Sequence, residues 1–293
     1  MIDWKDSIVN DIAKRRCVLF LGSGVSANCV NDAGERPKTW SAVLLEGITR
    51  LGADVSNKQK DTIRKAIKRN DLLMACELIR SHLGQDEYKD FIKSEFYDKH
   101  FYHAEIHEEI EQLDSRFVVT PNFDNIYEQY VHTIPNNDVV VAKYCDDNIA
   151  DLLRTARRLI IKSHGDITHG DRIIFTKSDY ANARSTYSQF YAILDALLLT
   201  HTFIFIGAGF SDPDIQLLLE DYTYRNKFKR NHFFITPRDS MSKEEFDIVS
   251  KTMSLRFITY DKKENHKELT DSIKELHRLV ETKRDEISTS KDW

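Results

Sequence analysis

The sequence has few cysteines, and none of them are paired. Its four cysteines, Cys17, Cys29, Cys76 and Cys145, are far apart and include no C-x-x-C pair. A zinc ribbon and a thioredoxin-like redox motif both need such pairs, so the spacing excludes both. We therefore expect reduced, buried thiols in a cytoplasmic protein and no bound metal.

The chain also lacks a long apolar run and an excess of basic residues. Its most apolar window, residues 192–210, is interrupted by Asp195 and His201, and the N-terminus has no continuous apolar segment. These features argue against a membrane span and a signal peptide. Lys and Arg number 42 against 47 Asp and Glu, for a net charge of -5. Because nucleic-acid binders are usually strongly basic, we expect no direct binding to nucleic acid or membranes.

What the sequence does contain is a series of short apolar runs, at residues 17–22, 116–121, 138–143, 158–163, 202–207, 232–237 and 255–260. Such runs are typical of strands buried on both faces, as in a parallel sheet between helices. Helical patterns occur between them, at residues 39–51, 57–69, 71–83, 104–114, 122–132, 185–199, 213–225, 242–252 and 265–283. The alternation predicts an α/β fold with a doubly wound, mostly parallel, Rossmann-like sheet.

One interval departs from this alternation. Residues 41–112 contain helical, aromatic-rich segments and no convincing strand, which predicts an inserted helical subdomain. The Rossmann-like core would then comprise about residues 10–40 and 113–262, followed by a C-terminal helix at about 263–285. We expect residues 1–293 to form a single domain, because no Pro-, Gly- or Ser-rich linker divides them.

The first apolar run ends in a glycine-rich turn. Gly22, Gly24 and Ala27 match the pattern G-x-G-x-x-G/A, in which backbone N–H groups approach a pyrophosphate. Two glycines after a strand also make an ordinary turn, so this motif alone leaves both interpretations open. A dehydrogenase would carry an acidic residue at the end of a second strand about 20 residues later. Residues 31–48 are instead a loop entering a helix, which disfavours an ordinary Rossmann oxidoreductase.

The second run is followed by Asn122 and Asp124. Either side chain could simply cap the next helix. The carboxyl end of a parallel strand is also where α/β sheets bind ligands. By themselves these residues leave the two interpretations evenly balanced.

The fourth run is followed by His164 and Gly165. A histidine titrates near neutral pH and can act as a general base. The alternative is a histidine on the rim that bonds a carboxylate such as Asp166. Taken alone, the motif slightly favours that alternative.

The fifth run ends in a second glycine-rich turn, with Gly207, Gly209, Ser211 and Asp212. Asp212 before a proline is a typical helix start, which does not explain the two glycines and the serine. Glycine lets the backbone approach a ligand, and Ser211 can bond a ribose or phosphate oxygen. Because all four elements follow buried strands, we expect them to meet at one sheet edge, where a dinucleotide could lie.

The order of these motifs resembles that of the sirtuin-like NAD-binding family: G-S-G-V-S-A at 22–27, T-P-N-F-D at 120–124, K-S-H-G at 162–165 and G-A-G-F-S-D-P at 207–213. It is most similar to the bacterial antiphage-defence branch, whose members cleave NAD, and R-P-K-T-W at 36–40 also matches that branch. The resemblance covers about residues 10–262. Protein deacylases of the family carry a zinc module with two C-x-x-C pairs, and they have a glutamine where this chain has Pro121. Neither feature is present here.

The resemblance implies a role for each motif. Gly22, Gly24 and Ser26 would line the pyrophosphate site. Asn122 would contact the nicotinamide ribose and orient the attacking water. The resemblance also implies that Asp124 would hold the nicotinamide side of the site and His164 would act as the base. The other NAD-binding residues that it implies are Ser23, Thr120, Gly165, Gly207, Gly209, Ser211 and Asp212, with Gly207 and Ser211 at the adenosine half.

On this basis we expect an NAD+ hydrolase that releases nicotinamide and ADP-ribose as the toxic effector of an antiviral, abortive-infection defence system. NAD+ would be its substrate, with no metal. An unregulated NADase would kill its host. Because the sequence ends soon after its last predicted strand, we expect no sensor domain in it. We therefore expect control by a partner encoded nearby, a nucleotide signal, or homo- or hetero-oligomerisation. The alternatives are an NAD-dependent protein deacylase or ADP-ribosyltransferase, and a non-catalytic sensor of NAD or ADP-ribose.

Overall fold

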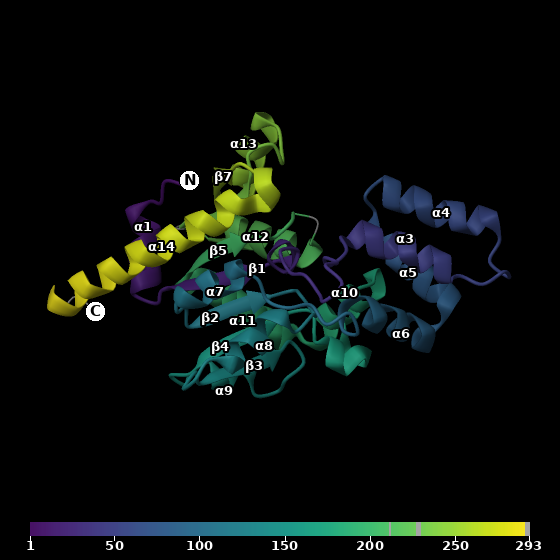
Figure 1. Ribbon diagram of the computed structural model, residues 1–293, viewed down its shortest axis with the longest axis horizontal. Coiled ribbons are helices and arrows are strands. Elements are labelled where there is room, and N and C mark those ends of the chain that lie inside the picture. Colours follow the sequence, from purple (N-terminus) through teal and green to yellow (C-terminus); the bar gives the residue numbers. More distant parts are fainter. Residues whose placement is uncertain (211, 227–229, 291–293) are drawn as a thin grey trace.

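A seven-stranded parallel sheet forms the centre of the fold (Figure 1). The computed structural model describes residues 1–210, 212–226 and 230–290, apart from the side chains of 169–171. The strands, in the order in which they lie across the sheet, are β3 (Val139–Lys143), β4 (Arg158–Lys162), β2 (Phe117–Thr120), β1 (Cys17–Leu21), β5 (Thr202–Ile206), β6 (His232–Pro237) and β7 (Leu255–Tyr260). Each neighbouring pair is parallel, so every strand expected from an apolar run is confirmed.

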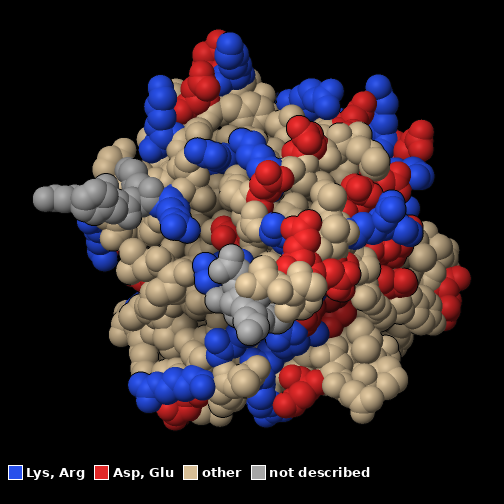
Figure 2. Space-filling model, turned by 90° about the vertical axis from the view of Figure 1, so that its left-hand side faces the viewer, with Lys and Arg blue, Asp and Glu red and all other residues tan. Residues whose placement is uncertain are grey.

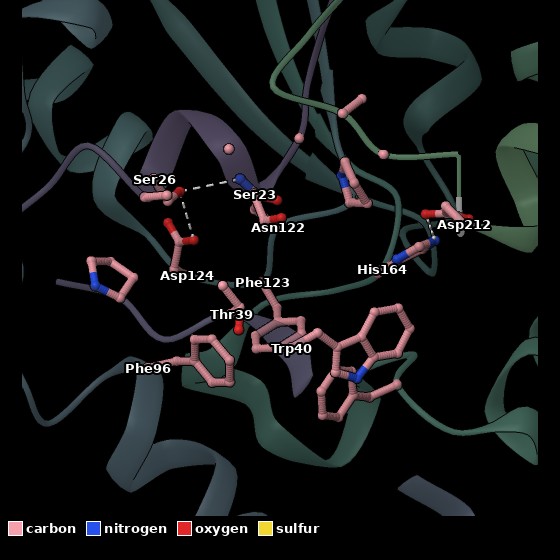
Figure 3. A pocket seen from close by; sticks show the side chains of 18 of the residues that line it. Ser23, Ser26, Thr39, Trp40, Phe96, Asn122, Phe123, Asp124, His164 and Asp212 are labelled. Carbon is pink, nitrogen blue, oxygen red and sulfur yellow. Dashed lines mark hydrogen bonds and ion pairs between the residues drawn. The ribbon is translucent and has the colours of Figure 1, made fainter. Parts of the chain in front are cut away.

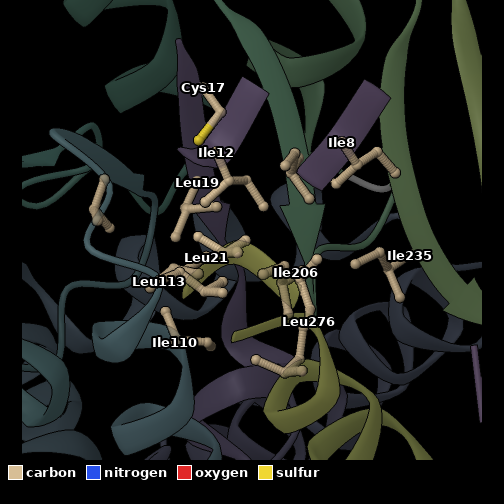
Figure 4. Packing of buried hydrophobic residues seen from close by; sticks show 14 of the residues in the cluster. Ile8, Ile12, Cys17, Leu19, Leu21, Ile110, Leu113, Ile206, Ile235 and Leu276 are labelled. Carbon is tan, nitrogen blue, oxygen red and sulfur yellow. The ribbon is translucent and has the colours of Figure 1, made fainter. Parts of the chain in front are cut away.

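Helices cover both faces of the sheet, which confirms the doubly wound α/β class. One face carries α1 (Asp6–Ala13), α7 (Glu105–Gln112), α8 (Ile126–Thr133) and α14 (Lys263–Ser290). The opposite face carries α9 (Ile149–Leu152), α10 (Lys177–Thr186), α11 (Ser188–Thr200), α12 (Pro213–Arg225) and α13 (Lys243–Thr252). Figure 4 shows the first layer, where Ile12 of α1 and Leu276 of α14 pack with Leu21 of β1 in one buried cluster.

Between β1 and β2 the chain forms mostly helices. After α2 (Ser23–Ser26) come α3 (Trp40–Arg50), α4 (Asn57–Lys68), α5 (Leu72–Leu83) and α6 (Gln85–Phe96), which extend to one side of the sheet in Figure 1. These four helices share a hydrophobic cluster of their own, which includes Leu44, Ile63, Ile79 and Phe91. The helical content of this interval is as expected, while the division of the chain at residues 41 and 112 stays a prediction.

Three helix boundaries differ from those expected. The helix expected at 122–132 begins at Ile126, because the Asp124 carboxylate accepts a hydrogen bond from Ile126 N and residues 122–124 stay in a loop. The helix expected at 185–199 is two helices, α10 and α11, which meet at Tyr187. The final helix extends to Ser290, beyond the expected 285, and residues 264–266 near its start have positive φ angles.

The strand order changes direction at β1. β1 pairs with β2 on one side and with β5 on the other. The chain continues from β1 to β2 on the first side and from β5 to β6 on the second, so the loops after β1 and β5 lead to opposite sides of the sheet. In open α/β sheets, ligands bind in the crevice that such a reversal opens at the carboxyl ends of the strands. The topology therefore places the first glycine-rich turn at the position where a ligand is expected.

Charged side chains of both signs lie on the surface. Within the described ranges, no helix is long and apolar enough to cross a membrane. Figure 2 shows one face of the molecule, on which Lys and Arg side chains are interspersed with Asp and Glu. This mixture fits the small net charge of -5.

Candidate active site

A cavity of about 410 Å³ lies at the carboxyl edge of the sheet, beside this reversal. Its size is within the range of small-molecule sites, roughly 300–1,000 Å³. Most of the residues singled out from the sequence line it: Gly22, Ser23, Gly24, Ser26, Asn122, Asp124, His164, Gly209 and Asp212. The sheet edge thus brings all four motifs to one cavity. Ser211 lies outside the described residues.

A hydrogen-bonded network links the first two motifs (Figure 3). The Ser26 hydroxyl donates to the Asp124 carboxylate at 3.0 Å and accepts from Asn122 Nδ2 at 3.2 Å. Within the described part of the chain, the amide oxygen of Asn122 has no hydrogen-bond donor. This network fixes the amide and the carboxylate relative to each other and leaves the Asn122 oxygen able to accept a hydrogen bond from a ligand.

His164 lies in a different part of the cavity wall, between acidic and aromatic groups. Its Nε2 is 3.6 Å from the carboxylates of both Asp212 and Asp214, at the start of α12. Its Nδ1 is 3.4 Å from the Tyr180 hydroxyl. The imidazole is 5 % exposed, so it meets the cavity from a largely buried position. Figure 3 shows His164 and Asp212 side by side, across the cavity from Ser26 and Asp124.

The acidic pair controls the protonation of His164. Burial alone would lower the pKa of this histidine, but the charges of Asp212 and Asp214 outweigh burial and raise the pKa above its ordinary value of 6.5. Burial also raises the pKa of Asp212. Burial would likewise raise the pKa of Asp214, but His164 and Arg184 hold it below its usual value. The imidazolium form is therefore stabilised, and a base role requires a pH high enough to remove that proton.

The two glycine-rich turns pack directly against each other. Gly22 N donates to Ile206 O at 2.9 Å, and Gly24 N donates to Gly207 O at 2.8 Å. A Cβ on Gly22 would lie 2.4 Å from the Gly207 carbonyl oxygen. The close approach that these glycines permit is therefore between two loops of the same chain. The N–H groups of Gly22 and Gly24 are already used, so they are not free to donate to a ligand.

Three expected binding residues lie beside the cavity and do not line it. Thr120 is 4 % exposed, and its hydroxyl donates to Leu21 O at 2.7 Å and accepts from Asn122 N at 3.1 Å. Gly165 follows His164 directly, and Gly207 accepts the bond from the first turn. These positions shape the loops that carry Asn122 and His164, and their assigned contacts with NAD stay predictions.

Comparison with known proteins finds a family match within this chain. Residues 116–258, from β2 to β7, match the family described as the SIR2-like domain. This segment is similar to the SIR2-like domain. The matched segment carries the Asn122, His164 and Asp212 elements of the cavity, and the first glycine turn precedes it.

Several proteins that this chain resembles are named for NAD hydrolysis or for defence. It is 22% identical over 286 residues to NAD(+) hydrolase ThsA of Enterococcus faecium, covering 91% of this chain and 56% of that protein. It is 21% identical over 238 residues to NAD(+) hydrolase ThsA of Bacillus cereus (strain MSX-D12), covering 81% of this chain and 46% of that protein. A third match, 26% identical over 160 residues, is Defense-associated sirtuin 2 of Bacillus subtilis; it covers 52% of this chain and 15% of that protein. The chain spans about half the length of the NAD(+) hydrolases that it matches.

Two of the helices between β1 and β2, α3 and α6, contribute aromatic rings to one wall of the cavity. Phe96 of α6 packs edge-on against Phe123. Trp40 of α3 stacks on Phe175, with 5.3 Å between the ring centroids. All four rings line the cavity. Phe123 and Phe175 also pack edge-on, at 5.2 Å. Through these ring contacts, α6 packs against the loop that carries Asn122 and Asp124.

Sequence reasoning missed several site residues. Asp214 could have been noticed, because it follows Asp212 and Pro213 in the first turn of an expected helix. Tyr180 lies on α10, whose pattern gave no helical signal. The Phe96 and Phe101 rings reach the cavity only through tertiary packing. Among the described residues, no three His, Cys, Asp or Glu side chains are grouped as a metal site.

Proposed function

We propose that the chain hydrolyses NAD+ at the bond between nicotinamide and ribose, giving nicotinamide and ADP-ribose. The observation that carries the proposal is that Asn122, Asp124 and His164 line one cavity beside the first glycine turn. The relatives named NAD(+) hydrolase ThsA support it, since they match most of this chain.

The chemistry of NAD+ suits these groups. Nicotinamide leaves a positively charged ribosyl bond as a neutral molecule, so the leaving group needs no acid catalyst. The protein has to hold the bond, stabilise an oxocarbenium-like ribose and present water. We assign the anion to Asp124, the orientation of water and ribose to the Asn122 amide, and the removal of a proton from water to His164.

The placement of Asp212 changes one part of this assignment. Sequence reasoning grouped Asp212 with the NAD-binding residues, but its carboxylate lies 3.6 Å from His164 Nε2. We propose that Asp212 acts on the protonation of His164, with Gly209 beside the dinucleotide. For the pyrophosphate we propose the Ser23 and Ser26 end of the first turn, since the N–H groups of Gly22 and Gly24 are engaged.

Product analysis in isotopically labelled water tests the reaction. The protein would be incubated with NAD+ in H₂¹⁸O, alone and with the products of neighbouring genes. We expect equal amounts of nicotinamide and ADP-ribose, with one ¹⁸O at the ribose C1 hydroxyl. ADP-ribose transferred to a protein, or deacylation of an acyl-lysine peptide, would instead support the alternatives with a protein substrate. Binding of NAD+ without any product under all conditions would support a sensor.

We also propose that this reaction depletes NAD+ as an antiviral effector under control in trans. The similarity to a defence-associated sirtuin and to the ThsA hydrolases supports this role. In cells that carry the gene with its neighbours, total NAD+ should fall after phage infection, and it should stay constant with the His164→Ala variant. Unchanged NAD+ together with retained phage resistance would contradict the effector role.

A further inference from the structure

The loop after β2 and the segment after β4 are joined where the sheet ladder ends. Ser163 N donates to Thr120 O at 2.9 Å, which continues the pairing one step beyond the strands. Ile167 N then donates to Phe123 O at 2.8 Å. These main-chain bonds link the loop that carries Asn122 to the segment that carries His164. Because both bonds join main-chain atoms, they do not depend on which side chains these residues carry.

A further link depends on one side chain, that of Lys162. Lys162 is the last residue of β4 and is fully buried, at 0 % exposure. Its Nζ donates to the main-chain oxygen of Asp124, to the Glu128 carboxylate, and to Asn125 Oδ1 at 3.0 Å. An ammonium group has three donors, and here each one has an acceptor. All three acceptors belong to the segment that begins at Asp124.

Stability alone gives little reason for a charge at this position. Removing an ammonium group and a carboxylate from water is costly, and replacing a buried ion pair by apolar residues of similar size is often neutral or stabilising. Lys162 also does not line the cavity, so it is not placed to touch a substrate. The ammonium group donates a hydrogen bond to the main chain of the loop, which an apolar side chain could not do.

Building on the proposed NAD+ hydrolysis, we propose that Lys162 is a positioning residue that fixes the loop of Asn122 and Asp124 relative to His164. Lys162 ends β4 two residues before His164 and holds the Asp124 carbonyl, so it sets the spacing between the loops that follow β2 and β4. Glu128 serves as its counter-ion and orients the ammonium. Loss of this bond lets the loop shift, and a shift of about 1 Å at a reacting group costs on the order of 100-fold in rate.

The test compares Lys162→Met with the double variant Lys162→Met/Glu128→Met, which removes both charges together. We expect kcat for nicotinamide release to fall on the order of 10- to 100-fold in both variants, with KM for NAD+ changed by less than about threefold. The single variant should unfold at a lower temperature, and the double variant should regain most of that loss. Lys143→Met, at the β3 position paired with Lys162, is the matched control and should keep its kcat.

The outcomes separate positioning from a purely structural role. If the double variant regains both thermal stability and wild-type kcat, the ion pair only stabilises the fold and the inference is wrong. The same holds if both variants keep wild-type kcat while His164→Ala loses it. If the wild type itself releases no nicotinamide under any condition, the proposed function fails and the inference fails with it.

Discussion

At the residue scale, the proposed role of His164 as a base depends on the groups around its imidazole. Its imidazole faces Asp212 and Asp214 at the start of α12, and Tyr180 and Arg184 of α10. The two carboxylates raise its pKa, whereas Arg184 acts in the opposite direction. A base must be unprotonated, so activity should rise with pH through a pKa above 6.5.

Asp214→Asn should move the rise of activity with pH to lower pH. Removing the carboxylate takes away stabilisation of the imidazolium and leaves Arg184 nearby, and both effects lower the pKa of His164. The pH profile of kcat/KM for nicotinamide release measures the shift, since it reports the free enzyme. A rise that stays in place or moves to higher pH would show that Asp214 does not set the protonation of the base.

The sequence revealed some of these residues and not others. Asn122 and His164 could be found because each directly follows a buried strand, and the ends of parallel strands meet at one edge. Tyr180 could not be found, because it reaches His164 through the packing of α10. The pairing of Asp212 with His164 also depends on how α12 approaches β4, which no local pattern encodes.

At the element scale, the two glycine turns act as one interlocked unit. Gly207 adopts a φ of +63°, and a Cβ there would lie 2.6 Å from Val25 N. A Cβ on Gly22 would in turn lie 2.4 Å from the Gly207 carbonyl oxygen and from Ala208 Cα. Any displacement of the loop after β5 therefore displaces the turn after β1.

Gly22→Ala should destabilise the fold by about 2 to 3 kcal/mol, because its Cβ meets backbone atoms that cannot move independently. It should also lower turnover, since Ser23 and Ser26 would shift with the turn. Gly34→Ala is the control: it also adds a methyl, but with no atom within 4 Å, and should cost only about 1 kcal/mol for its left-handed backbone. Denaturant unfolding measures both variants. Equal stability of the two would show that the turns do not constrain each other.

The sequence predicted strands better than helix boundaries. The inner strands β1, β2 and β5 are apolar runs buried on both faces, and the edge strands β3 and β7 are still mostly apolar, which leaves a clear signal. In α10 only Tyr180 and Ala183 are buried, so the helix has almost no apolar stripe to detect. The start of α8 depends on a hydrogen bond from Ile126 N to Asp124, a choice between loop and helix that residue composition does not decide.

At the scale of the whole molecule, buried histidines make stability depend on pH. Burial lowers the pKa of His232 and of His107 to about 4. Both are therefore neutral in the folded state but bind protons near pH 6.5 when unfolded. Their contribution to stability is complete above pH 6.5 and is lost as the pH falls towards 4.

His232→Asn should flatten the dependence of the unfolding free energy on pH between 6.5 and 4. Asn keeps an acceptor near the position of His232 Nδ1, which receives the Phe203 N–H at 3.1 Å, but it cannot bind a proton. The wild type should lose on the order of 3 kcal/mol over this range through His232 alone. Denaturant unfolding at several pH values gives the two slopes. If the unfolding free energies of wild type and variant depend on pH in the same way, His232 is not the source of this pH dependence.

The central claim concerns the whole cavity, and nicotinamide release from NAD+ by four matched proteins tests it most directly. The wild type, Asn122→Ala, His164→Ala and the surface control His132→Ala would be assayed under the same activating conditions. We predict that the two cavity variants lose about 100-fold or more in rate while remaining folded. His132→Ala should match the wild type, because this side chain is exposed on α8. Wild-type rates in both Asn122→Ala and His164→Ala would contradict the account.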